Sequence, residues 1–223
     1  MKKSKLAKVL TVSLAALMVF GLASCGGGSG KVSDKDITVI SREEGSGTRD
    51  AFTELTGVLQ DDVDKTVDTA EISNSTSVVT QSVAGNDAAI GYISLGSLDD
   101  TVKAVKVDGV EATVDNIKSG DYKIQRPFNI VTKGEVKELP ADFIKFIMSK
   151  DGQKIIEDEG YISVNDNAEA YKASGLKGSI TLAGSTSVSP VMEVLADKYK
   201  ELNSGVTIEI QQTGSGAGIQ STT

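Results

Sequence analysis

A short β-rich run and a polar, glycine-bearing loop follow one another in the stretch Ile37-Thr38-Val39-Ile40-Ser41-Arg42-Glu43-Glu44-Gly45-Ser46-Gly47-Thr48-Arg49-Asp50. Apolar residues at helical spacing come next, and Gly57 offers a stop signal for the helix that they predict. The stretch therefore predicts a strand, a loop of small residues and a helix in immediate succession.

Two further loops of Gly, Ser and Thr follow predicted strands later in the chain. The strand at Ile180–Ala183 leads into Gly184-Ser185-Thr186-Ser187-Val188-Ser189-Pro190, where Ser189 fits the cap of a helix that runs from Pro190 to about Leu202. The strand at Val206–Ile210 leads into Thr213-Gly214-Ser215-Gly216-Ala217-Gly218 and an unfinished helix at 219–223. Strand, small-residue loop and helix thus recur three times.

The composition of these loops is typical of a site that binds an oxyanion. A helix N-terminus offers unpaired N–H groups and the positive end of the helix dipole, and small side chains let an anion reach both. Ser and Thr hydroxyls add donors without adding charge, and Arg42 and Arg49 can supply a bidentate fork. The plainer alternative is that the loops only make tight turns and that their hydroxyls only cap helices.

The rest of the chain predicts alternating helices and strands, and hence the α/β class. We expect a helix around Val78–Val83 that ends near Gly85-Asn86, strands at Ala88–Ser94, Val102–Val107 and Phe128–Val131, a turn at Asp108-Gly109, and a helix at Ala141–Lys150 that Gln153–Glu159 continues.

Composition excludes several kinds of site. The 223 residues contain no His and one Cys, so a Ser-His-Asp triad, a Cys-His dyad, a Cys/His zinc cluster and an internal disulfide are all impossible. No loop has the P-loop pattern or the spacing of a dinucleotide loop, and we expect no cofactor and no metal. The formal net charge of −8 argues against a nucleic-acid partner.

The N-terminus predicts export. Four lysines precede an apolar run that ends in Leu22-Ala23-Ser24-Cys25, and Gly26-Gly27-Gly28-Ser29-Gly30 follows. This pattern resembles a bacterial lipobox, which implies a signal peptide at 1–24, lipidation (palmitate) of Cys25 and a Gly/Ser-rich tether at 25–36. The alternative is a buried thiol beside an uncleaved anchor helix.

Three motifs carry a second resemblance. The loops at 41–52, 183–191 and 212–218 resemble those of the phosphate-binding lipoproteins, PstS-like proteins that serve Pst-type ABC importers, and AIGYISLGSL, RPFNIVTKGE and FIKFIMSKDGQKIIEDEGYISV also look familial. The family implies a type II periplasmic-binding-protein fold, with two α/β lobes around a ligand cleft. By motif position, the implied phosphate ligands are Arg42, Ser46, Gly47 and Thr48 from one lobe and Thr186, Ser187 and Ser215 from the other. Arg49 falls outside this set and is left as a surface residue.

The order of the motifs departs from that family, because GSTSVSP usually precedes REEGSGTRD. The chain therefore resembles a circularly permuted or tandem variant, and it stops before the Asp of a D-I-G type segment, so we expect two incomplete lobes at 37–126 and 127–223. Near the boundary, residues 125–128 are expected to be the hinge.

The resemblance implies a lipid-anchored protein on the extracytoplasmic face of the cell membrane, which captures inorganic phosphate and delivers it to the permease subunits of an ABC importer without catalysis. Three alternatives stay open: a binding protein for another oxyanion such as sulfate, a phosphoryl-transfer enzyme with Asp50 or Glu44 as base, and a surface lipoprotein with a structural role.

Overall fold

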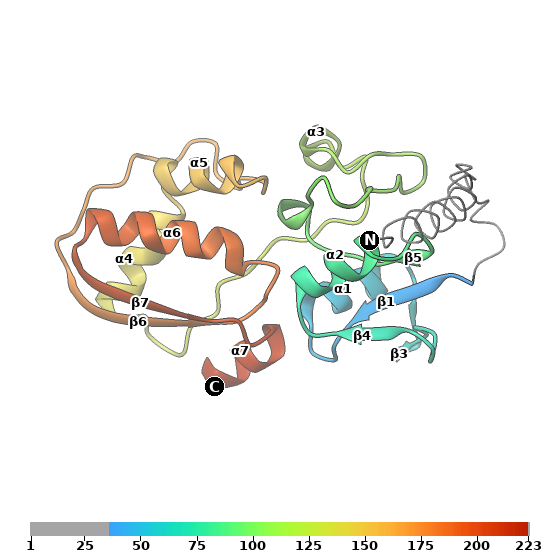
Figure 1. Ribbon diagram of the computed structural model, residues 1–223. Coiled ribbons are helices and arrows are strands. Elements are labelled where there is room, and N and C mark those ends of the chain that lie inside the picture. Colours follow the sequence, from blue (N-terminus) through green and yellow to red (C-terminus); the bar gives the residue numbers. More distant parts are fainter. Residues whose placement is uncertain (1–35, 223) are drawn as a thin grey trace, which may run out of the picture. The chain divides into compact units, whose positions relative to one another are not determined.

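Helices and short strands make up residues 36–222, the part of the chain that the computed structural model describes (Figure 1). The expected signal peptide, Cys25 and all but the last residue of the tether lie outside it. The elements are β1 (Thr38–Arg42), α1 (Gly47–Leu55), β2 (Leu59–Gln60), β3 (Val63–Asp64), β4 (Glu71–Ser73), α2 (Thr76–Ala84), β5 (Ala89–Ile90), the 3-10 turn η2 (Leu95–Ser97), α3 (Val114–Lys118), α4 (Glu138–Ile147), α5 (Lys150–Asp158), β6 (Lys177–Ala183), α6 (Ser189–Leu202), β7 (Gly205–Gln211) and α7 (Ser215–Thr222).

The first sheet is parallel, with the strand order β4-β1-β5. Its central strand β1 buries Ile40, which is 2% exposed, and α2 covers it with Val79, which is 1% exposed. The pairing of β1 with β4 runs to the end of β1, where Arg42 lies opposite Ser73, whereas its pairing with β5 stops at Val39. The carboxyl end of β1 therefore has a backbone partner on one side only.

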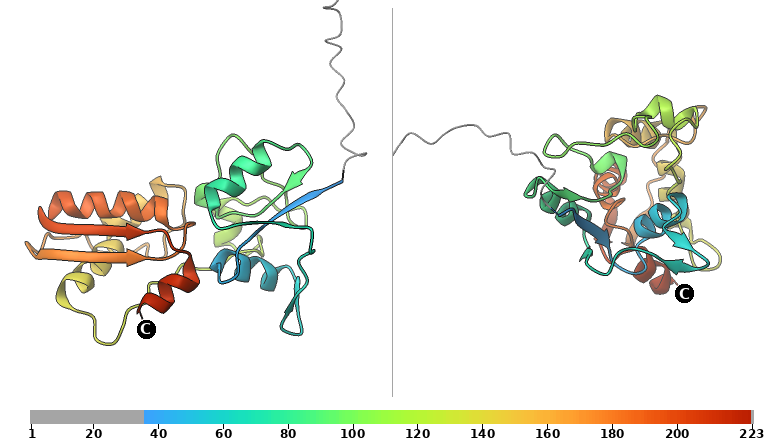
Figure 2. Two further views of the ribbon diagram at one scale, coloured as in Figure 1. Left: turned by 60° about the horizontal axis from the view of Figure 1, so that its bottom comes forward. Right: turned by 90° about the vertical axis from the view of Figure 1, so that its right-hand side faces the viewer.

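The second sheet pairs β6 with β7 in parallel over seven residues each, from Lys177 opposite Gly205 to Ala183 opposite Gln211. Helix α6 connects the two strands and runs alongside them, as Figures 1 and 2 show. Pro190 lies in its first turn, where the missing N–H costs nothing. The buried apolar side chains of this part come from α4, α6, both strands and Tyr161: Phe143, Phe146, Ile147, Tyr161, Ile180, Val191, Leu195, Ala196, Tyr199 and Val206.

A carboxylate holds the loop before β6 to two helices. Oδ2 of Asp142, in α4, accepts hydrogen bonds from the Tyr171 hydroxyl at 2.5 Å, the Ser174 hydroxyl at 2.8 Å and the Tyr199 hydroxyl of α6 at 2.8 Å. Burial alone would raise the pKa of Asp142, but these three donors outweigh burial and hold the pKa below its usual range. Burial and the bond to Asp142 together raise the pKa of Tyr199. The network therefore stabilises the ionised form of Asp142.

Most predicted elements are confirmed, and the strand at Val102–Val107 and the strand at Phe128–Val131 are wrong. Val107 makes only an isolated bridge to Val110 across the predicted Asp108-Gly109 turn, which is confirmed. At 128–131, three apolar side chains are about half exposed, and no strand within residues 36–222 lies beside this segment. β-Propensity needs a neighbouring strand to act on, which explains both errors.

Several boundaries also differ from prediction: α1 begins at Gly47 and α7 at Ser215, inside the loops expected at 41–50 and 213–218. The apolar strand expected at 88–94 is reduced to β5. The continuous helix expected over 141–159 is divided into α4 and α5, because the Ser149 hydroxyl caps α5 by accepting from the Gly152 N–H. Helix α6 is capped at Val188, one residue before the predicted Ser189. No helix in residues 36–222 combines the length and the apolar character that crossing a membrane requires.

Replacing the carboxylate of Asp142 tests the network. Asp142→Asn should lower the free energy of unfolding at pH 7 by about 1–2 kcal/mol, because the amide offers a neutral acceptor where three hydroxyls now bind a charge. An aspartate with a lowered folded-state pKa stabilises the fold above its unfolded-state pKa of about 3.9 and loses that contribution as pH falls. Urea unfolding at several pH values should therefore show the difference shrinking below about pH 4. Asp158→Asn, at an exposed ion pair with Lys154, should cost little at any pH, and an equal loss in both variants would contradict the assignment.

Candidate functional site

Four turns from a parallel strand into a helix meet around Arg42: β1 to α1, β4 to α2, β6 to α6, and β7 to α7. Three of them are the predicted Gly/Ser/Thr loops, and all three lead into helices as predicted. In parallel sheets, ligands bind beyond the carboxyl ends of the strands, where such turns lie. The N-termini of the four helices therefore also lie at this end.

The guanidinium of Arg42 lies at the centre of this region and is 1% exposed. Its Nη1 donates to the Thr76 hydroxyl at 3.2 Å, its Nη2 to the Thr186 hydroxyl at 3.1 Å, and its Nε to the backbone carbonyl of Ser73 at 3.1 Å. The partners come from α2, the loop before α6 and the end of β4. One side chain therefore joins three of the four turns.

Glu43 supplies the countercharge. Its two carboxylate oxygens accept from Nε and Nη2 of Arg42 at 2.9 and 3.0 Å, and its side chain is 23% exposed. A buried guanidinium without a partner would be strongly destabilising, so this bidentate pair is what permits Arg42 to lie inside the molecule. The sequence alone assigned no role to Glu43.

Hydroxyl groups surround the guanidinium. The Ser187 hydroxyl lies 2.8 Å from that of Thr48 and 3.0 Å from that of Thr76, and the Thr76 and Thr186 hydroxyls lie 3.0 Å apart. Each of these hydroxyls can donate or accept. Together they can turn several donors toward an oxyanion without any change of protonation.

Small residues bring two of the turns into contact. The Gly216 N–H donates to the Gly45 carbonyl at 2.9 Å. A Cβ at Gly47 would lie 2.9 Å from the Ser215 hydroxyl oxygen, so the first residues of α1 and α7 lie side by side and a side chain at position 47 would displace that hydroxyl. Ser46 is 2% exposed and caps α1, because its hydroxyl accepts from the Arg49 N–H at 3.4 Å.

All seven sequence-predicted ligand residues lie in this region, in two sets. Direct hydrogen bonds connect Arg42 with Thr186, and Thr48 with Ser187. Ser46, Gly47 and Ser215 lie in the contact between α1 and α7. Their role as ligands stays a prediction.

Thr76 was missed by sequence reasoning. It is 4% exposed and touches Arg42, Thr186 and Ser187. The signal was present in Ser73-Asn74-Ser75, a short polar loop between a strand and a helix, but this loop contains no glycine and did not match the other three.

Arg49 is partly exposed and makes structural contacts. Its guanidinium pairs with Asp64 of β3 at 2.7 Å and donates to the Arg42 carbonyl at 2.9 Å. The Thr66 hydroxyl lowers the pKa of Asp64 more than any other group, and Arg49 lowers it further. Asp50 and Glu44, the bases considered for an enzyme, are both exposed.

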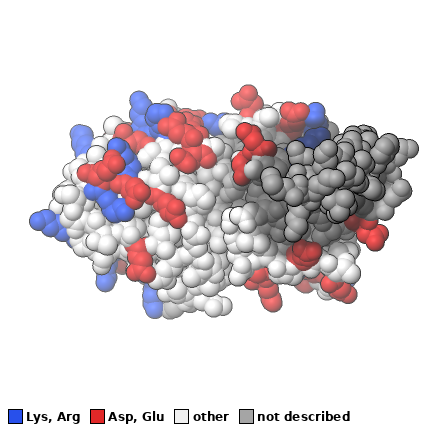
Figure 3. All heavy atoms as spheres, viewed as in Figure 1, with Lys and Arg blue, Asp and Glu red and all other residues white. Residues whose placement is uncertain are grey.

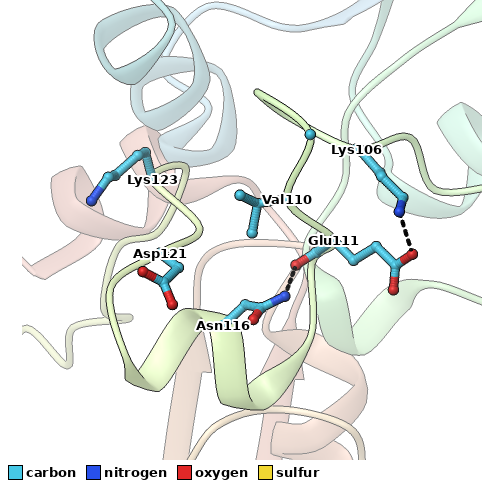
Figure 4. A pocket seen from close by; sticks show the side chains of 7 residues that line it. Lys106, Val110, Glu111, Asn116, Asp121 and Lys123 are labelled. Carbon is cyan, nitrogen blue, oxygen red and sulfur yellow. Dashed lines mark hydrogen bonds and ion pairs between the residues drawn. The ribbon is translucent and has the colours of Figure 1, made fainter.

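A hollow elsewhere on the molecule is a weaker candidate (Figure 4). It lies at α3 and is open to solvent, and its two lysines are matched in number by two carboxylates, Glu111 and Asp121. Lys106 pairs with Glu111 at 2.9 Å, and the Asn116 amide donates to the Glu111 carbonyl at 3.0 Å. Lys123 donates to the Gly120 carbonyl. In contrast to Arg42, none of these groups is buried.

Comparisons with known proteins agree with the fold and with the motifs. Residues 28–151 match the PBP superfamily domain. The phosphate-binding protein PstS 2 of Streptococcus agalactiae is 51% identical over 228 residues, which cover 99% of this chain and 77% of that protein. The protein of the same name from Streptococcus pneumoniae is 48% identical, over 96% of this chain and 76% of its own length.

Solved structures agree as well. A phosphate-binding protein of a phosphate ABC transporter from Streptococcus pneumoniae matches with a TM-score of 0.67 at 49% identity, over 84% of this chain and 75% of that one. A putative phosphate ABC transporter substrate-binding protein from Clostridium perfringens, solved with bound phosphate, matches with a TM-score of 0.54 at 46% identity, over 57% of this chain and 52% of that one.

Parallel α/β sheets whose helix N-termini meet at a buried arginine, together with the domain match, define a binding protein of the PBP superfamily. Within it, the chain belongs to the PstS family of phosphate-binding proteins. This family consists of transport proteins that bind without catalysis, so the phosphoryl-transfer alternative is set aside.

Thr76→Val tests whether the missed threonine belongs to the buried network. The substitution keeps the shape but leaves Arg42, Thr186 and Ser187 each without one partner, so the free energy of unfolding should fall by about 1–3 kcal/mol. Thr80→Val is the matched control in the same helix, because the buried Thr80 hydroxyl only bonds back to the Thr76 carbonyl. Urea unfolding of both variants measures the difference, and losses of equal size would be evidence against the network.

Proposed function

We propose that the chain captures inorganic phosphate and delivers it to the permease subunits of an ABC importer, without catalysis. The single observation that carries this proposal is the buried Arg42 guanidinium, surrounded by hydroxyls from three strand-to-helix turns. The relative from Clostridium perfringens with bound phosphate supports it.

The proposed ligands are Arg42, Ser46, Gly47, Thr48, Thr186, Ser187 and Ser215, to which the contacts of Thr76 add an eighth. An entering phosphate would replace the hydroxyl-to-hydroxyl bonds, so that each hydroxyl donates to a phosphate oxygen. Glu43 occupies the Nε–Nη2 edge of the Arg42 guanidinium, whereas the Nη1–Nη2 edge, now bonded to the Thr76 and Thr186 hydroxyls, matches two oxygens of one anion. The phosphate would therefore be bound by uncharged hydroxyl donors together with the positively charged guanidinium of Arg42.

The net charge of −8 does not oppose this function. On the face shown in Figure 3, Asp and Glu side chains lie interspersed with Lys and Arg side chains, and broad stretches carry neither. Surface charges are screened beyond about 8 Å at physiological ionic strength, whereas the donors around Arg42 act at contact distance.

Two lobes, at 37–126 and 127–223, would close on the anion about a hinge near Gln125–Phe128. In support, the β4-β1-β5 sheet belongs wholly to the first range and the β6-β7 pair wholly to the second. The hydrogen bonds from Arg42 to Thr186 and from Thr48 to Ser187 connect the two ranges. A ligand that prefers the closed state would shift the equilibrium toward it.

The permuted order of the motifs and the lipid anchor at Cys25 belong to the same proposal. The streptococcal PstS 2 proteins align with 96–99% of the chain, whereas PstS of Bacillus subtilis aligns with 64% of it, which supports an order of segments that only some relatives share. The lipobox resemblance at 22–25 supports anchoring at the extracytoplasmic face of the membrane.

Arg42→Ala should weaken phosphate binding by about a hundredfold or more, because a buried charge with hydrogen bonds to the ligand is lost. Isothermal titration calorimetry measures the affinity, and circular dichroism shows whether the variant folds. Lys154→Ala is the control, because Lys154 is exposed, pairs with Asp158 within α5 and lies outside both the site and the proposed hinge; its affinity should match that of the unchanged chain.

Unchanged affinity in Arg42→Ala would contradict the proposed site. The choice of anion is tested separately, because phosphate should raise the thermal midpoint of the unchanged chain more than sulfate does. A larger shift with sulfate would assign the chain to another oxyanion.

A further inference from the structure

The tetrapeptide Gly-Tyr-Ile-Ser occurs twice in the chain, at 91–94 and at 160–163. The first copy follows β5 and the second follows α5, so the two lie in different surroundings. In both copies the tyrosine hydroxyl bonds to the backbone of a proposed ligand residue, Arg42 in the first and Ser187 in the second. Neither tyrosine belongs to the ligand set proposed above.

Tyr92 bonds to the backbone that carries Arg42. The Arg42 N–H donates to the Tyr92 hydroxyl at 3.1 Å, and the same hydroxyl lies 2.7 Å from that of Ser41. Because β5 stops pairing with β1 at Val39, this N–H lies beyond the last backbone partner on that side of β1. Arg42 is 1% exposed, so the phenol and not bulk solvent is the hydrogen-bond partner of this N–H in the folded chain.

Tyr161 bonds to the backbone that carries Ser187. Its hydroxyl donates to the Ser187 carbonyl at 2.8 Å, and the Ser94 hydroxyl donates to the same carbonyl at 3.3 Å. This carbonyl lies just before α6, whose ladder begins with the Val188 carbonyl, and Ser187 is 0% exposed. The phenol therefore donates to a carbonyl, that of Ser187, which accepts no hydrogen bond from the N–H groups of α6.

Both rings are held in place by packing. Tyr92 stacks on Phe52 of α1, with ring centroids 4.1 Å apart and planes 7° apart. Tyr161 is 7% exposed and meets the Phe128 ring edge-on at 6.0 Å. A Cβ at Gly96 would lie 2.2 Å from a carbon of the Tyr161 ring, so only glycine admits the ring there. Rings fixed in this way can fix the peptides to which their hydroxyls bond.

We propose that Tyr92 and Tyr161 are positioning residues for the anion site: one phenol sets the backbone that carries Arg42, the other the backbone that carries Ser187. This inference rests on the proposed function for its ligand. A displaced Arg42 or Ser187 backbone would misdirect the guanidinium or the hydroxyl that meets the anion. Each copy of the tetrapeptide thus supplies one tyrosine hydroxyl that positions the backbone at one of the turns.

Tyr92→Phe and Tyr161→Phe remove the hydroxyls and keep the rings. Each should weaken phosphate binding about tenfold by isothermal titration calorimetry, through loss of one buried hydrogen bond. Tyr171→Phe is the matched control, because its phenol bonds to Asp142 in the network described above. It should lower the thermal midpoint and leave the phosphate affinity within twofold, which separates positioning from stability.

Two spectroscopic signals report on the peptides without any ligand. Exchange of the Arg42 amide hydrogen, followed by NMR, should become at least tenfold faster in Tyr92→Phe, and the carbonyl carbon resonance of Ser187 should shift in Tyr161→Phe. Tyr171→Phe should change neither.

Each tyrosine is judged on its own variant. Phosphate affinity within twofold of the unchanged chain would overturn its positioning role. If the unchanged chain binds no phosphate, the proposed function fails, and the two NMR signals then decide: unchanged exchange and an unshifted resonance overturn the inference, and the predicted changes support it.

Discussion

A buried guanidinium is the group on which the arrangement of this chain depends most. Arg42 is 1% exposed, and its guanidinium carries a positive charge. Burial is tolerable only if the charge is paired and its N–H donors have acceptors. Glu43 supplies the charge, and the acceptors on Ser73, Thr76 and Thr186 lie 31, 34 and 144 positions away in the sequence. The end of β1 therefore brings distant turns to one place.

The hydroxyls around that charge explain how a chain without histidine can bind an anion. They bond to one another at 2.8–3.0 Å, and no buried side-chain nitrogen or oxygen of residues 36–222 lacks a partner. Because a hydroxyl can donate or accept, the same groups can satisfy one another and can also bind an oxyanion. Neither state requires a proton to be gained or lost, which is why the composition of the chain suits this task.

Local patterns predicted much of this from the sequence. The loops at 41–50, 183–190 and 212–218 combine glycines with Ser and Thr after a strand, and the structure brings them together. Thr76 was missed because its loop has no glycine, and Glu43 because its partner Arg42 is adjacent in sequence while the burial of the pair depends on distant turns. Burial is a property of the fold that spacing along the chain does not report.

The errors in the strands have a related cause. Val102–Val107 and Phe128–Val131 have the alternation and the β-branched residues of strands, but a strand exists only beside another strand, and residues 36–222 provide none there. The helix predicted across 141–159 divides at Ser149, whose hydroxyl caps α5. Local propensity was right in both helical halves and could not report the break between them.

A crystal structure of the chain grown with inorganic phosphate tests the central claim most directly. The anion should lie within hydrogen-bonding distance of the Arg42 guanidinium and of the Thr48 and Ser187 hydroxyls, which would no longer bond to each other. A phosphate bound elsewhere, or none, with the Thr48 and Ser187 hydroxyls still 2.8 Å apart, would contradict it.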